Sequence, residues 1–116
     1  MKIKKRKIAA VIKKDCKTRH IYFGKDGATC AVGGLLVAAG IGKKRFFDEG
    51  GRNTGGIDTL PESIVSLLYD AYGLNKEDLR EIQRTNDCES TTEERREALL
   101  AVLKTMQQTT IQTERT

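Results

Sequence analysis

The sequence predicts an α+β domain that is mainly α, with a small β-hairpin and a helical bundle around a buried glycine-rich helix. Three observations lead to this prediction. Apolar residues recur at helical spacing behind capping residues through the second half of the chain. The stretch 30–39 has no charged side chain and contains two adjacent glycines. A short run of strand-forming residues, 20–23, leads into an Asp-Gly turn signal.

Length and composition fit one folded domain. The 116 residues can bury a modest core, and 38% hydrophobic with 32% charged residues is typical of a globular chain. The uncharged run 28–42 is too short to cross a bilayer, and the apolar run after the basic start is too short for a signal peptide. We therefore expect a cytoplasmic protein without membrane contact, with a single domain over 1–107 and a flexible C-terminal tail over 108–116.

The first predicted elements are a basic segment and the hairpin. Ile8, Val11 and Ile12 fit one face of a helix. The basic residues before them oppose the helix dipole, so a short strand over 8–12 remains an alternative. Residues 20–23 are predicted as a strand that turns at 24–27, and its partner strand has to be very short because a helix begins almost at once.

Residues 30–39 are predicted to form the central helix of the core. Thr29 is a suitable N-cap, and glycines follow at 40 and 42. Because this helix is apolar on every side, we expect it to be buried on every side. Gly33 and Gly34 each cost roughly 1 kcal/mol relative to alanine inside a helix. Close approach of a neighbouring backbone is the simplest reason to keep them.

The rest of the chain reads as a loop followed by helices. Residues 48–58 hold four of the eleven glycines, and a loop of this length is a candidate working or mobile segment. Capping boxes at Thr59–Glu62 and Thr91–Glu94, and a cap at Asn75, predict three helix starts. The pair at 86–87 breaks the helical pattern and reads most simply as a turn between helices. The inward-facing residues are Ile64, Leu67, Leu68 and Ala71, then Leu79 and Ile82, then Leu99, Val102, Leu103 and Met106.

The three cysteines, Cys16, Cys30 and Cys88, are widely and irregularly spaced. An odd number at such spacing does not indicate a disulfide framework, and no Cys/His cluster indicates a zinc site. We expect no metal and no other cofactor.

Cys30 is the sharpest catalytic candidate. A thiol in the first turn of a helix is stabilised as thiolate by the helix dipole. His20 could act as its base across the hairpin, and Asn86 or Asp87 could orient that histidine. The alternative function is therefore a Cys30-dependent hydrolase or transferase. The simpler interpretation is that Cys30 is a small core residue that opens a buried helix.

Charge is strongly polarised along the chain. Residues 1–25 carry a net charge of +9, residues 26–52 carry +1 and residues 53–116 carry −5. A basic leading segment can meet phosphate, an acidic protein surface or the acidic second half of its own chain.

This charge predicts a partner-binding surface. A nucleic-acid backbone is one candidate partner, with Tyr22 and Phe23 available to stack on bases, although no helix-turn-helix, zinc-finger or RNA-binding signature is present. The predicted partner-binding residues are Lys4, Lys5, Arg6, Lys7, Lys13, Lys14, Arg19, Lys43, Lys44, Arg45 and Arg52.

The segment Cys30-Ala-Val-Gly-Gly-Leu35, followed by Asn86-Asp87, then Thr91 or Thr92, then Leu99, resembles a family of small uncharacterised proteins of phages and bacteria. In that family the helix reads Cys-x-x-Gly-Ala-Leu and an aromatic residue usually precedes Asn-Asp. This chain has Gly34 and Thr85 at those two positions. The resemblance spans roughly residues 8–106. It implies the fold and a phage or mobile-element origin, and the family has no established activity.

Together these observations predict a small non-enzymatic accessory protein that binds a host protein or nucleic acid. The binding surfaces we expect are the basic N-terminal segment and the glycine-rich loop 48–58. The alternatives are the Cys30-dependent enzyme and a protein that reads a nucleic-acid backbone.

Overall fold

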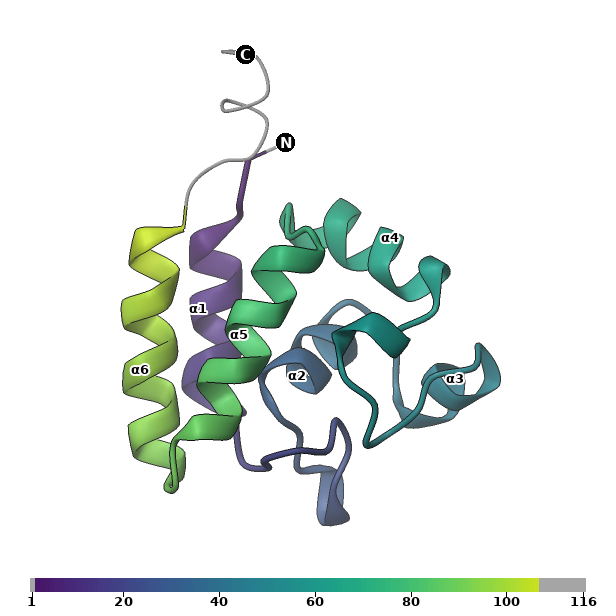
Figure 1. Cartoon of the computed structure of the whole chain (residues 1–116), viewed down its shortest axis with the longest axis horizontal. Helices are drawn as coiled ribbons and strands as arrows, with labels where there is room; N and C mark the ends of the chain where they lie inside the picture. The colour runs from purple at the N-terminus through teal and green to yellow at the C-terminus, as the bar shows by residue number, and fades with distance from the viewer. Residues whose placement is uncertain (1, 107–116) are drawn as a thin grey trace.

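Helices make up nearly all of the regular structure of this protein. The computed structural model describes residues 2–106, so the predicted tail, 108–116, lies outside the described residues. Among the described residues there are six α-helices and two short 3-10 helices (Figure 1). The α-helices are α1 (Lys5–Lys14), α2 (Ala31–Ala38), α3 (Lys43–Asp48), α4 (Glu62–Tyr72), α5 (Lys76–Cys88) and α6 (Thr92–Thr105), and the 3-10 helices are η1 (Lys25–Gly27) and η2 (Ile57–Thr59).

The helices surround α2. Helices α1 and α6 lie side by side, and α5 packs against α6 and against α2 (Figure 1). Helix α1 also contacts α2, so that α2 has a helix on either side. Helix α3 and the glycine-rich loop lie at the far end of the molecule from α1 and α6 (Figure 1). The mainly helical prediction is confirmed.

The predicted β-hairpin is wrong. Over residues 2–106 there is no strand, only one isolated antiparallel bridge between Phe23 and Thr29. The backbone of Phe23 is instead satisfied by a side chain thirty positions away. The Phe23 N–H donates to Asn53 Oδ1 (2.8 Å), and Asn53 Nδ2 donates to the Phe23 carbonyl (2.9 Å). Since η1 fills the turn and α2 begins at Ala31, no second strand has room to form.

The N-terminal segment is a helix, not a strand. Ile8, Val11 and Ile12 are buried along one face of α1, as the spacing predicts. No acidic residue stands in its first turn to offset the basic ones, while Lys13 and Lys14 favour the dipole at its end. Packing of the apolar face therefore decides the conformation against the unfavourable start.

Helix starts follow local capping chemistry in part. The boxes Asn75–Asp78 and Thr91–Glu94 are both formed. The box predicted at Thr59 is not formed, because the Thr59 hydroxyl donates to the Gly56 carbonyl and α4 begins after Pro61.

The pair at 86–87 is not a turn, since α5 continues through it to Cys88. The tight turn in this part of the chain is at Gly73, which ends α4 in the left-handed conformation (φ 78°).

The glycine-rich helix α2 is buried as predicted over its first six residues, from Ala31 to Leu36. A Cβ built on Gly33 would lie 2.1 Å from the Tyr22 carbonyl oxygen, so the close backbone approach that the two glycines indicated is present. Burial on every side is wrong for the last turn, where Val37 is half exposed. The N-cap is Cys30, one position after the predicted Thr29.

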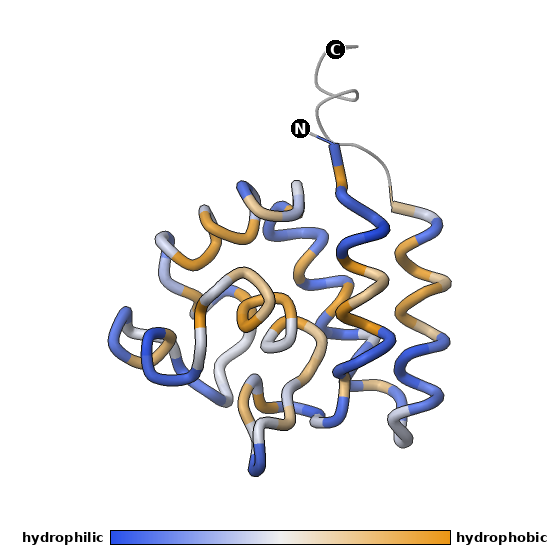
Figure 2. Tube along the Cα trace, turned by 180° about the vertical axis from the view of Figure 1, so that it is seen from behind, coloured by the Kyte–Doolittle hydropathy of each residue, from blue (hydrophilic) through white to orange (hydrophobic). Residues whose placement is uncertain are grey.

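No helix within residues 2–106 has the length and apolar character needed to span a bilayer. The apolar positions of the trace lie mostly between neighbouring helices, and α1 and α6 are again side by side when the molecule is seen from behind (Figure 2).

Candidate functional site

The structure brings the four predicted catalytic residues into one polar network at the start of α2. The Cys30 Sγ donates to Gln83 Oε1 (3.5 Å), and Gln83 Nε2 donates to both carboxylate oxygens of Asp87. The Asp87 Oδ1 accepts the His20 backbone N–H (2.9 Å), and His20 Nδ1 lies 3.6 Å from Asp87 Oδ2. The prediction missed Gln83, which lies one helical turn before Asp87 and links it to the thiol.

Asn86 holds this network together from inside the core. It is fully buried, and its Oδ1 accepts the backbone N–H of Ala31 (3.1 Å) at the first turn of α2. Its Nδ2 donates to the Thr18 carbonyl (2.9 Å) and to Asp87. Asn86 therefore caps α2 and fixes the segment before it, which is a structural task.

The Cys30 thiol is closed off from solvent. Its residue has no exposed surface, and burial raises its pKa to about 12. The hydrogen bond from the Gly33 N–H (3.3 Å) lowers the pKa, in the direction that the dipole predicts, but desolvation is the larger effect. Near neutral pH the group is a thiol, and the thiolate is the form that attacks carbon.

None of the described residues places a base against that thiol. Its side-chain partner is the amide of Gln83, which does not take up a proton at ordinary pH. The His20 side chain is 69% exposed and faces Asp87. The geometry therefore supports the interpretation of Cys30 as a packed core residue. A Cys30-dependent hydrolase or transferase needs an accessible nucleophile with a base beside it, and this site shows neither.

The basic residues of α1 stay free of internal ion pairs. Lys4, Arg6, Lys7, Lys13 and Lys14 are exposed. Over the described residues, no lysine or arginine before residue 20 lies within ion-pairing distance of a carboxylate. Up to residue 106, the acidic second half of the chain does not neutralise this helix by direct pairing. We call these five residues the basic face of α1.

Lys43, Lys44, Arg45 and Arg52 do not join that face, whereas Lys5 lies in α1 itself. Lys43, Lys44 and Arg45 lie on α3, at the opposite end of the molecule from α1 (Figure 1). Lys44 pairs with Asp48 and Arg45 pairs with Glu49 along the same helix.

Arg52, in the glycine-rich loop, is exposed. The residue after it, Asn53, ties the loop to the backbone of Tyr22 and Phe23. Gly51 lies directly against the ring of Phe46. The structure thus separates the loop from the basic face and anchors it at its middle.

An apolar groove that the sequence reasoning missed lies between α1 and α6. It has a volume of about 360 Å³, and its floor is formed by Ala9, Leu100 and Leu103. Its rim is formed by Lys5, Arg6, Lys13 and Lys104. The sequence signal for it is Leu100, an apolar residue outside the predicted inward face of the last helix.

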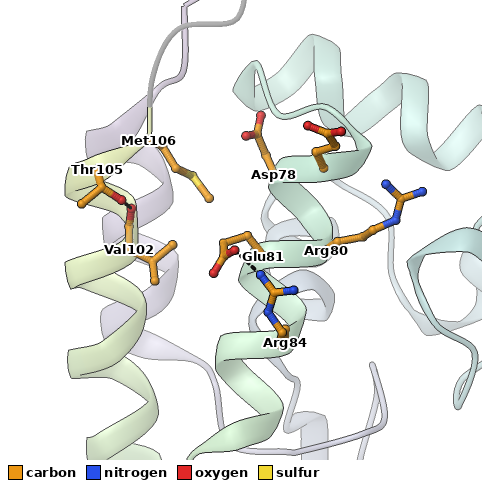
Figure 3. Close-up of a pocket in the computed structure, with 8 residues that line it drawn as sticks. Asp78, Arg80, Glu81, Arg84, Val102, Thr105 and Met106 are labelled. Carbon is orange, nitrogen blue, oxygen red and sulfur yellow. Dashed lines mark hydrogen bonds and ion pairs between the residues drawn. The ribbon is translucent and has the colours of Figure 1, made fainter.

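A larger hollow of about 630 Å³ lies between α5 and α6 (Figure 3). Val102 and Met106 line it from α6, and acidic residues line it from α5 (Figure 3). Four of its charged side chains, Asp78, Arg80, Glu81 and Arg84, are engaged with other groups. Glu81 pairs with Arg84, and Asp78 accepts the Asn75 N–H in the capping box of α5.

One buried arginine was not predicted. Arg95 is 5% exposed, and its guanidinium donates to the carbonyls of Cys16, Lys17, Glu89 and Ser90. It therefore fastens α6 to the chain that leaves α1.

Among residues 2–106, no three His, Cys, Asp or Glu side chains are grouped so as to hold a metal ion. Comparison with protein-family models, with curated proteins and with solved structures gives no match to this chain.

Proposed function

We propose that this chain is a small non-enzymatic accessory protein that binds an anionic surface of a host macromolecule through the basic face of α1. The resemblance of its cysteine helix and Asn-Asp pair to phage and bacterial proteins leads us to propose a phage or mobile-element origin and a bacterial host. The observation that carries the proposal is the set of exposed cations at α1 that pair with none of the carboxylates of residues 2–106.

The part of this charge in the first turn acts against the stability of α1. Lys5, Arg6 and Lys7 occupy the first turn, where each cation opposes the helix dipole by roughly 0.3–1 kcal/mol. Lys5 Nζ donates to the Lys104 carbonyl and Lys7 Nζ donates to the Ala71 carbonyl, while Ile8, Val11 and Ile12 supply the buried contacts of the helix. A partner of opposite charge would explain why exposed cations are placed where they destabilise their own helix. Such cations attract an anionic partner at distances up to about a Debye length.

A second site at the glycine-rich loop has weaker support. Two of the cations beside it, Lys44 and Arg45, are neutralised on α3, and the loop is held by Asn53. We therefore assign binding to the basic face of α1 alone and a structural role to the loop.

The test is recovery of a partner from bacterial lysate by the tagged chain, with and without nuclease. One variant carries Lys4→Glu, Arg6→Glu and Lys13→Glu. The matched control carries Lys25→Glu, Lys43→Glu and Arg52→Glu at the other end of the molecule. Both variants change the net charge from +5 to −1, so they differ only in where the charge is removed.

Loss of the partner with the α1 variant and its retention with the control is the expected result. Equal recovery by both variants, or no partner for the unchanged chain, contradicts the proposal. Recovery that disappears with nuclease identifies the partner as nucleic acid.

A further inference from the structure

The α1–α6 groove combines an apolar floor with a basic rim. Its floor is apolar, with Ala9 and Leu100 half-buried and Leu103 buried. Its rim carries four cations, and two of them, Arg6 and Lys13, also belong to the basic face of α1. The groove and the basic face are thus parts of one surface.

We infer that this groove receives the apolar side of an acidic amphipathic helix supplied by a protein partner. The inference rests on the proposed function and names the class of partner for that same surface. Leucine-like residues of such a helix would cover the floor. Its glutamates or aspartates would reach the rim at Arg6, Lys13 and Lys104, which pair with no carboxylate in the part of the chain that the structure describes.

The shape of the groove suits a helix. Two helices lying side by side leave a furrow along their line of contact, into which the side-chain ridges of a third helix fit. At 1.5 Å per residue the ten residues of α1 extend about 15 Å. That length matches about three turns of a partner helix, with anchor residues at i, i+3 or i+4, and i+7.

A nucleic acid fits this surface less well. Phosphates gain nothing from an apolar floor, and bases bind single-strand sites by stacking on aromatic rings. Neither α1 nor α6 contains an aromatic residue. Tyr22 and Phe23, the rings that the sequence offered for stacking, are buried at 2% and 6% exposure and pack against Phe46.

The test is a titration of the ¹⁵N-labelled full chain followed by amide chemical shifts. The acidic probe is a synthetic peptide of about 15 residues, with Leu at i, i+3, i+4 and i+7, Glu on both flanks and Ala elsewhere. The control peptide has Lys in place of every Glu, and a DNA duplex of about 15 base pairs is the third probe.

The acidic peptide is expected to shift the amides of Ala9, Leu100 and Leu103, while the basic peptide leaves them unchanged. Ala9→Gln places a longer polar side chain on the floor without altering charge, and it should weaken the acidic peptide at least about tenfold. Ala101→Gln makes the same change on an exposed position of α6 outside the groove and should leave affinity unchanged.

Unchanged groove amides with the acidic peptide refute the inference. If the duplex then shifts Lys4, Lys7 and Lys14, the basic face keeps its binding role and only the class of partner is wrong. If no probe binds, the inference fails and the lysate experiment decides the proposed function separately. Groove shifts that grow with protein concentration alone identify a second copy of this chain as the occupant, which also refutes it.

Discussion

Gly33→Ala tests the packing at the centre of the fold. In an isolated helix this change would add roughly 1 kcal/mol of stability. Here the new Cβ would lie 2.1 Å from the carbonyl oxygen of Tyr22, which also accepts the Cys30 N–H. The neighbour is backbone, so it cannot rotate away. Relieving the overlap costs about 1–3 kcal/mol, and weakening that hydrogen bond costs about 1 kcal/mol more. We expect a net loss of about 1–3 kcal/mol.

Two other glycines of the same chain are matched controls. A Cβ on Gly42 meets no atom within 4 Å, so Gly42→Ala should be close to neutral. A Cβ on Gly34 meets the side chain of Asp15 at 2.7 Å, and that side chain can move in part, so Gly34→Ala should fall between the two.

The assay is urea unfolding followed by far-ultraviolet circular dichroism, which gives the free energy of unfolding for each variant. From the least to the most destabilised variant, the expected order is Gly42→Ala, Gly34→Ala and Gly33→Ala. A Gly33→Ala variant as stable as the unchanged chain would refute the close approach of Tyr22 to α2.

Three further predictions concern buried groups. Arg95→Lys should lower the free energy of unfolding by about 2–4 kcal/mol, because an ammonium cannot reach the four carbonyls that the guanidinium binds; an unchanged urea midpoint would contradict this. Under native conditions at pH 8 a thiol reagent should modify exposed Cys88 at least about tenfold faster than buried Cys16 and Cys30, and all three should react at similar rates in denaturant, which mass spectrometry can follow. Burial raises the pKa values of Cys16, Cys30 and Tyr72 to about 12, so the folded state holds these protons more tightly than the unfolded state. The free energy of unfolding should therefore be constant up to about pH 9 and should fall as the pH rises towards 12. A urea midpoint that is unchanged at pH 11 would disprove this prediction.

Most elements specified by near neighbours in the sequence could be predicted, the box at Thr59 being an exception, and those specified by distant groups could not. The caps at Asn75 and Thr91 involve residues three positions apart, and both are present. The hairpin failed because Asn53, from a loop with no strand pattern, binds the backbone of Phe23. Arg95 reads as one more surface charge in a basic pair, since its acceptors are backbone carbonyls that leave no signature in the sequence.

The same division holds for the candidate site. Residue type and order suggested that His20 and Asp87 lie near Cys30, and they do belong to one network. The burial of the Cys30 thiol could not be predicted from the sequence, because it depends on how α2 and α5 pack together. Desolvation then outweighs the dipole effect that motivated the enzyme alternative.

The proposed function attributes the role of this protein to the basic face of α1 and none of it to the thiol. The most direct measurement compares partner recovery by the unchanged chain, by Cys30→Ser and by the Lys4→Glu, Arg6→Glu, Lys13→Glu variant, after circular dichroism has shown that all three are folded. Serine can keep the cap at the start of α2. We predict that Cys30→Ser recovers the same partner as the unchanged chain and that the charge variant does not. Loss of the partner with Cys30→Ser, together with full recovery by the charge variant, would contradict the proposal.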